Sequence, residues 1–195
     1  MNLAEILPDD TYAGVRVRLL ATLGRARLSV GIDVNFGDPI WPAASKIILP
    51  RLVQIGQQPV HILGYPLPMV IAEKTVAALE RGEANTRWRD FADVLTISGV
   101  HEISASELAA ALQAVATYRE VVVQPLLLAL AAMPETAQVK WAAWRRRQAH
   151  AHKLPERFAD TLSLVAAFTD PVLNDEATEG SRWNPTRQMW EQAGP

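Results

Sequence analysis

Lys74 carries a positive charge inside an apolar stretch of the sequence. In the run Met69-Val-Ile-Ala-Glu-Lys-Thr-Val-Ala-Ala-Leu79, helical spacing places Ile71, Lys74 and Ala78 on one stripe. A buried ammonium group is costly unless a counter-charge or an anionic ligand compensates it. The alternative is a lysine whose aliphatic stem covers its apolar neighbours while its ammonium group reaches water.

Two aspartates, three residues apart, follow on the next expected helix. Asp90 and Asp93 lie in the run Asn85-Thr-Arg-Trp-Arg-Asp-Phe-Ala-Asp93, so they share one helix face near its first turn. They are candidates for binding a metal ion or for orienting a catalytic lysine. The alternative is that carboxylates at this place only gain from the helix dipole. Arg87 and Arg89 beside them are candidates for substrate binding, and they are compatible with both interpretations.

A third acidic candidate, Asp33, lies in an otherwise apolar strand pattern. It faces the side opposite to Ile32 and Val34. Aspartate is depleted in strands, and one reason for it here would be a divalent metal ion held from the sheet. A strand face that is open to solvent is the alternative.

Residues 140–157 form a basic segment with six Lys or Arg side chains and one glutamate, which gives a net charge of +5. Arg145 and Arg146 in this segment are candidates for binding a nucleic-acid backbone, and Trp141 and Trp144 on one helix stripe are candidates for stacking on bases. The alternatives are tryptophans of the core and a solvated charged face. His150 and His152 form only a weak metal signal, because no third ligand follows at a suitable spacing.

The elements that would position these side chains can be read from periodicity. Alternating apolar residues predict strands, and Pro68 and Gly82 mark the start and the end of the helix that carries Lys74. Because the turn at residues 83–86 is short, the next helix should run back beside the first, and we expect Lys74 and Asp90 to converge. The expected elements are a hairpin of strands 14–20 and 27–34, a strand at 60–63, and helices at 68–81 and 87–97.

After residue 100 the pattern predicts helices only. Ser104 with Glu107 three residues later is typical of a helix start with a capping box. We expect a tail from Asp170 that is an ordered loop packed by Trp183 and Trp190. The predicted helices cover residues 104–119, 125–132, 136–150 and 155–168. The fold class is therefore α+β, with the sheet and its packed helices in residues 1–100 and a helical bundle in residues 101–195.

Composition excludes several classes of protein and site. The 195 residues contain no cysteine, which excludes disulfides, thiolate metal sites and cysteine nucleophiles. The net charge of −2 gives no overall nucleic-acid signature, so such a partner would have to bind a local patch. The first residues are not typical of a signal peptide, and the longest apolar run is broken at Gln124 and Pro125. We expect a soluble, cytoplasmic protein with no membrane partner.

The order of these segments resembles the AbiEii/AbiGii-type nucleotidyltransferase toxin family. The resemblance spans nearly the whole chain and is most specific in its middle. Its motifs are Tyr12-Ala-Gly-Val-Arg-Val-Arg18, Gly31-Ile-Asp-Val-Asn-Phe-Gly-Asp-Pro39, Val70-Ile-Ala-Glu-Lys74, Gly82-Glu-Ala-Asn-Thr-Arg87, Arg89-Asp-Phe-Ala-Asp93 and Trp183-Asn-Pro185.

The resemblance implies a role for each candidate. Lys74 matches the lysine of the Ala-Glu-Lys motif that contacts nucleotide phosphates, and Asp90 matches a catalytic aspartate. Asp33 matches an acidic sheet position that supports the metal site, and Asp93 closes the same motif as Asp90. The family implies Mg²⁺ as cofactor, a nucleoside triphosphate and RNA, including tRNA acceptor ends, as substrates, and a cognate antitoxin in a toxin–antitoxin or abortive-infection system.

One departure from the family pattern concerns its first motif, a Gly-Ser followed by Asp-x-Asp, whose aspartates hold the magnesium ions. No Asp-x-Asp occurs in the sequence, and its one Gly-Ser, Gly180-Ser181, has no such partner. We therefore expect residues 1–100 to be the remnant of a nucleotidyltransferase domain, truncated or completed by another polypeptide, and inactive alone. The alternative is a non-catalytic RNA-, nucleotide- or protein-binding module derived from that fold.

Overall fold

The computed structural model describes residues 2–3, 14–37, 39–51 and 58–192. Its backbone contacts divide the chain into two units, Met1–Pro39 and Ile40–Pro195, and each is described by itself. The described residues combine six α-helices with small antiparallel sheets, so the expected α+β class is confirmed. The predicted division at residue 100 stays a prediction.

The first unit is a small antiparallel sheet in the order β1-β2-β3. Strand β1 is Asn2–Leu3, β2 is Gly14–Leu23 and β3 is Ala26–Asn35. The predicted hairpin is confirmed, with a register that runs from Gly14 opposite Asn35 to Leu23 opposite Ala26. The turn between the strands contains Gly24 at a φ of 58°, a conformation that glycine adopts without steric cost.

Two further strands pair with each other. The predicted strand is β5, Val60–Gly64, and its antiparallel partner is β4, Ser45–Leu49. The sequence pattern did not predict β4, because its consecutive apolar residues show no alternation. A Cβ at Gly64 would meet the Cδ1 of Ile47 at 2.6 Å, so a larger residue there would require the end of the Ile47 side chain to move.

The helix that carries Lys74 and its successor have nearly the predicted bounds. Helix α1 is Leu67–Arg81, the 3-10 turn η1 is Gly82–Ala84, and α2 is Trp88–Ser98. Pro68 lies in the first turn of α1, where its missing N–H costs nothing. Gly82 ends the helix with a φ of 56°.

Four helices follow, and their bounds differ from the prediction at several places. They are α3 Ala105–Tyr118, α4 Leu126–Ala129, α5 Met133–Arg145 and α6 Phe158–Leu173, with the 3-10 turn η2 at Ala151–Lys153. The Ser104 hydroxyl accepts a hydrogen bond from the Glu107 amide at 3.5 Å, as expected for a helix cap. Helix α4 is a single turn, and α6 continues through Pro171, which the pattern had placed in the tail.

The predictions of helices only after residue 100 and of a loop from Asp170 are wrong. Strand β6 (Ile103–Ser104) pairs with β7 (Ser181–Asn184), and β7 pairs with β8 (Met189–Gln192). These strands are too short for periodicity to detect them. The expected packing role of the tryptophans is confirmed, because Trp183 is buried and its indole donates to the Ser98 carbonyl at 2.7 Å.

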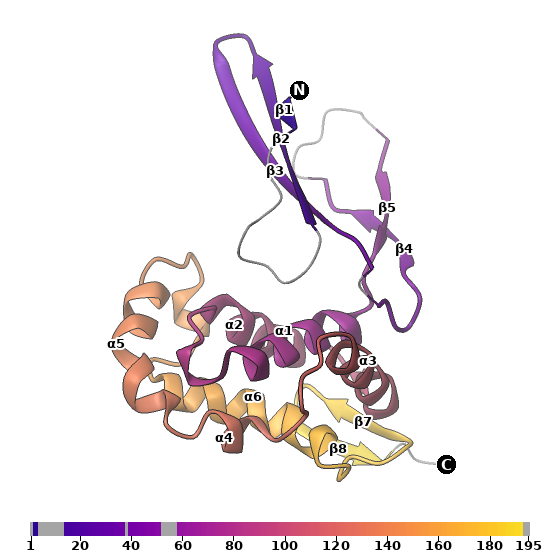
Figure 1. Ribbon diagram of the computed structural model, residues 1–195, viewed down its shortest axis with the longest axis vertical. Helices are drawn as coiled ribbons and strands as arrows, with labels where there is room; N and C mark the ends of the chain where they lie inside the picture. The colour runs from indigo at the N-terminus through magenta and orange to yellow at the C-terminus, as the bar shows by residue number, and fades with distance from the viewer. Residues whose placement is uncertain (1, 4–13, 38, 52–57, 193–195) are drawn as a thin grey trace. The chain divides into compact units, whose positions relative to one another are not determined.

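The core of the second unit lies between its helices. In Figure 1, α1 and α2 lie above α6, with α3 beside them and α5 at the outer end. Phe158 at the start of α6 is fully buried, and its ring contacts Trp88, Phe91 and Trp141 edge-on or tilted. Among the described residues, no helix has the length and apolar character that crossing a membrane requires.

Candidate functional site

The expected convergence of Lys74 and Asp90 is confirmed. The Lys74 Nζ lies 3.2 Å from the Asp90 Oδ1 and 2.7 Å from the Asp93 Oδ2. The lysine side chain is 20% exposed, so it is neither sealed in the core nor extended into water. The antiparallel arrangement of α1 and α2 thus gives Lys74 the counter-charge that its apolar stripe requires.

Asp90 is the buried member of this cluster, with a side chain that is 5% exposed. Its second oxygen, Oδ2, lies 2.8 Å from the Nε of Arg87, which is 55% exposed. Each oxygen of the buried carboxylate therefore faces a cation, which offsets the cost of removing it from water. Asp90 also lies in the first turn of α2, where the helix dipole favours a negative charge.

Asn85 sets the start of α2 and was not among the predicted site residues. It is buried, and its side-chain oxygen accepts a hydrogen bond from the Arg87 amide at 2.8 Å. An Asx turn of this kind is a signal that the sequence did contain, in the form of an asparagine just before the helix. It fixes the backbone from which the Arg87 side chain reaches Asp90.

The cluster of Lys74, Arg87, Asp90 and Asp93 balances two positive and two negative charges. A lysine ammonium group has three N–H donors, and two of them are directed at the aspartates. The exposed part of Lys74 and the exposed guanidinium of Arg87 can therefore meet an anion while the cluster stays intact. Arg89 is exposed, and no ion pair joins it to the described part of the chain.

A second ion cluster holds α1 against the end of α3. Arg119 forms ion pairs with Glu73 and with Glu80, the latter at 3.1 Å, and these glutamates lie two turns apart on α1. Burial alone would lower the pKa of Arg119, but the two glutamates outweigh it and raise that pKa above its usual value. Because Glu73 precedes Lys74, this clamp fixes the rotation of the helix that presents the lysine.

Asp33 is paired within its own sheet. It lies directly opposite Arg16, whose Nε and Nη2 donate to its two oxygens at 2.6 and 2.9 Å. The hydrogen bond from Arg16 lowers the pKa of Asp33, so the carboxylate stays ionised to lower pH. Both side chains are about half exposed, in keeping with the alternative of a solvent-exposed strand face. A metal-supporting role for Asp33 stays a prediction.

The described carboxylates do not form an evident magnesium site. No group of three acidic or histidine side chains suited to a metal ion occurs within residues 2–3, 14–37, 39–51 and 58–192. Asp33, Asp90 and Asp93 each face a cation already. Magnesium therefore stays an expectation that comes with the family.

In the basic segment, Trp141 follows the core alternative and is not exposed for stacking on bases. Trp141 is fully buried, stacks on Trp144 at 5.2 Å between ring centroids, and donates its indole N–H to the Pro155 carbonyl. It is a core residue, the alternative that helical spacing left open. Arg145 donates to the Leu154 carbonyl, whereas Arg146 is exposed.

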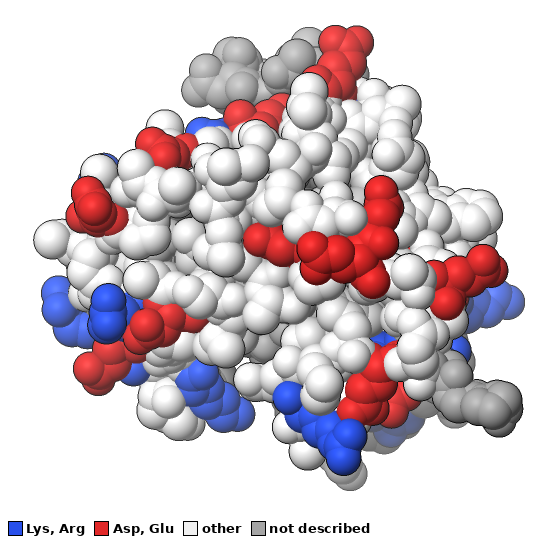
Figure 2. Space-filling model, turned by 90° about the horizontal axis from the view of Figure 1, so that it is seen from below, with Lys and Arg blue, Asp and Glu red and all other residues white. Residues whose placement is uncertain are grey.

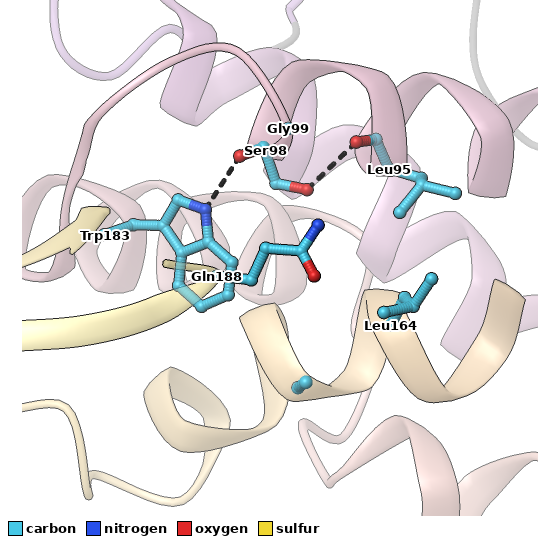
Figure 3. Close-up of a pocket in the computed structure, with 7 residues that line it drawn as sticks. Leu95, Ser98, Gly99, Leu164, Trp183 and Gln188 are labelled. Carbon is cyan, nitrogen blue, oxygen red and sulfur yellow. Dashed lines mark hydrogen bonds between the residues drawn. The ribbon is translucent and has the colours of Figure 1, made fainter. Parts of the chain in front are cut away.

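A small crevice, partly open to solvent, lies where α2, α6 and the β7–β8 turn meet. It has a volume of about 90 Å³, and Figure 3 shows the Trp183 indole and Gln188 on one side of it and Leu164 on the other. No residue that lines it carries a titratable group. The crevice is thus an imperfection of packing rather than a place for acid–base chemistry.

The comparisons with known proteins agree with the resemblance noted from the motifs. The model of the family described as "AbiEii: Nucleotidyl transferase AbiEii toxin, Type IV TA system" matches residues 2–164. Neither a curated protein nor a solved structure matches the chain. The match begins at residue 2, so it does not establish that a part of the family domain is missing.

Proposed function

Since the chain belongs to the AbiEii nucleotidyl transferase toxin family of type IV toxin–antitoxin systems, we propose that its α1–α2 hairpin binds nucleotide phosphates. In this proposal Lys74 donates to a phosphate oxygen, Asp90 fixes the lysine, and Arg87 and Arg89 add positive charge at the entrance. The buried Asp90 that holds a partly exposed Lys74 is the observation that carries the proposal.

The proposal is supported by the free energy that is needed to bury the Asp90 carboxylate. Burying a carboxylate on a helix pair costs free energy unless each oxygen is compensated, and here both are. An ammonium group held in one direction also loses little side-chain entropy when an anion arrives. Pre-organised cations of this kind are what phosphoryl transfer requires, because its catalysis consists largely of positioning and charge stabilisation.

We further propose that this chain alone does not transfer nucleotides. Metal-assisted transfer relies on carboxylates that hold the metal against both the attacking and the leaving oxygen. The sequence contains no Asp-x-Asp pair, and each described candidate aspartate is already ion-paired. Magnesium at this site would require carboxylates from elsewhere.

The partners follow from the family and are part of the proposal. They are a nucleoside triphosphate, an RNA such as a tRNA acceptor end, and a cognate antitoxin, all in the cytoplasm. The second candidate function, a non-catalytic binding module, is favoured by one observation, the absence of the Asp-x-Asp pair. Both candidate functions use the α1–α2 hairpin, and they differ in whether a nucleotide is transferred to RNA.

A transfer assay tests the proposal. The full chain is incubated with each labelled nucleoside triphosphate, Mg²⁺ and total tRNA, and incorporation into RNA is measured. We expect no incorporation above a protein-free blank. Lys74→Ala is the informative variant, and Lys46→Ala, which removes an exposed lysine of β4, is its matched control.

Metal-dependent incorporation that disappears in Lys74→Ala and persists in Lys46→Ala would overturn the proposed inactivity while supporting the assigned role of Lys74. Incorporation that persists in both variants would contradict the role of Lys74 as well.

A further inference from the structure

An open groove runs along α3 on the second unit. Its volume is about 440 Å³, and its α3 side is formed by Ala109, Ala110 and Leu112. Two consecutive alanines leave space where longer side chains would fill the surface of the helix. Leu112 is buried, whereas the two alanines are half-buried.

The opposite side of the groove is also aliphatic. Val172 and Leu173 at the end of α6 and Val123 before α4 line it. The segment that contains Val123 exposes further apolar side chains, since Val122 is 81% exposed and Leu128 is 68% exposed. Exposed aliphatic side chains in such a run suggest a surface for binding another molecule.

The polar groups of the groove exclude an anionic ligand. Only Gln113 and Asp175 among its lining residues are polar, and neither is a cation. The Gln113 amide already donates to the Thr117 hydroxyl. A nucleotide or an RNA backbone would meet one carboxylate and no positive charge, so neither is a suitable occupant.

The surrounding sequence is strongly acidic. Residues 102–139 contain one basic residue, Arg119, which is paired with Glu73 and Glu80, and residues 158–181 contain no Lys or Arg. The same two ranges carry nine acidic residues, which are Glu102, Glu107, Glu120, Glu135, Asp160, Asp170, Asp175, Glu176 and Glu179. Figure 2 shows a face on which wide areas are uncharged, acidic side chains gather near the middle, and basic side chains lie mostly toward the margins.

We propose that this groove binds a helix of a partner protein that has one apolar stripe flanked by Lys and Arg. The apolar stripe would fill the space beside Ala109 and Ala110, and the flanking cations would meet Asp175 and its acidic neighbours Glu176 and Glu179. Charge complementarity selects a basic helix over an acidic one and speeds its association. This interaction surface is separate from the phosphate-binding hairpin, so it goes beyond the proposed function.

A peptide-binding experiment tests this proposal. The probe is a fluorescent helical peptide of about 15 residues with leucines at helical spacing and lysines on both flanks. The control peptide keeps the leucines and carries glutamates in place of the lysines. We expect the lysine peptide to bind the full chain, as measured by fluorescence anisotropy, and the glutamate peptide to bind at least about tenfold more weakly.

Two variants locate the binding. Ala110→Arg fills the groove and should weaken binding by about tenfold or more. A triple variant, Asp175→Asn with Glu176→Gln and Glu179→Gln, removes the negative charge beside the groove. Asparagine is chosen at position 175 because it tolerates the positive φ there. This variant should bind the lysine peptide more weakly, and its binding should depend less on salt. Its control is Glu156→Gln, which removes an exposed acid outside the two acidic ranges. If Ala110→Arg fails to fold by circular dichroism, the triple variant decides.

Equal binding of both peptides, or binding that the groove variants leave unchanged, would overturn the proposal. Analytical ultracentrifugation measures whether the chain self-associates. If the chain self-associates and a groove variant that folds dissociates it, the occupant is a second copy and the partner helix is ruled out.

Discussion

At the scale of single residues, Lys74 forms ion pairs with two carboxylates that differ in solvent exposure. The Asp90 side chain is 5% exposed and the Asp93 side chain 41%, although both lie within 3.2 Å of the same ammonium group. The buried partner depends on the lysine for its compensation, whereas water can replace the lysine at the exposed one. The pattern of the sequence predicted that Lys74 meets Asp90. It could not predict which of the two aspartates is the buried one, because their burial depends on how α2 packs on α6.

The two pairs should therefore differ in their effect on stability. Lys74→Met leaves Asp90 with Arg87 alone and should lower the free energy of unfolding by about 1–3 kcal/mol. Asp93→Asn should lower it by less than about 1 kcal/mol, because that pair is exposed. Urea denaturation followed by tryptophan fluorescence measures both. If Asp93→Asn costs more than Lys74→Met, the assignment of Asp90 as the dependent partner is wrong.

At the scale of elements, α4 is too short to be stable by itself and depends on a side chain from α6. The carboxylate of Asp170 accepts hydrogen bonds from the amides of Leu126 and Leu127 at 2.8 and 3.2 Å. These amides begin α4 and would otherwise lack partners. The sequence predicted a helix at residues 125–132, and its shortening to Leu126–Ala129 reflects a tertiary contact that no local pattern contains.

Removal of this cap should have a measurable cost. Asp170→Ala should destabilise the chain by about 1–2 kcal/mol, because two amides lose their acceptor. Asp170→Asn keeps one acceptor oxygen and should cost less. Asp160→Ala, which removes an exposed acid in the first turn of the same helix, is the control and should cost below about 1 kcal/mol. Thermal denaturation compares the three, and equal costs for Asp170→Ala and Asp160→Ala would contradict the cap.

Long, periodic elements were predictable and short ones were not. The β2–β3 hairpin, α1 and α2 have strong alternation or clear end signals such as Gly82, and their bounds agree with the prediction within a few residues. Strands β6, β7 and β8 have at most four residues each, and their pairing joins residues far apart in the sequence. The hydrogen bond from Trp183 to the Ser98 carbonyl likewise could not be read from either residue alone.

At the scale of the whole chain, charge is separated along the sequence. The basic segment 140–157 has a net charge of +5, and it lies between two ranges that carry nine acidic residues and one basic residue. Within the segment, Arg146, Arg147 and Lys153 are exposed and have no ion-pair partner in the part of the chain that the structure describes. Any affinity for RNA should therefore come from this segment.

This affinity should be strongly salt-dependent. An RNA held by about three phosphate contacts would lose roughly 20- to 40-fold in affinity between about 50 and 200 mM salt. Reversal of Arg145, Arg146 and Arg147 to glutamate should abolish binding, as measured by filter binding or anisotropy with total tRNA. Arg182→Glu, which reverses an exposed arginine of β7, should leave it nearly unchanged. Binding that survives the triple reversal or ignores salt would indicate a merely solvated face.

The position of Trp183 has a consequence for how the protein is made. Its indole completes the core beside α2 by binding a carbonyl 85 residues earlier in the chain, and it lies beyond residue 164, where the family match ends. At ordinary rates of translation, the ribosome needs on the order of ten seconds to synthesise that interval. Until then the surface that Trp183 later covers stays open on the nascent chain, so this unit reaches its native state only when β7 has left the ribosome.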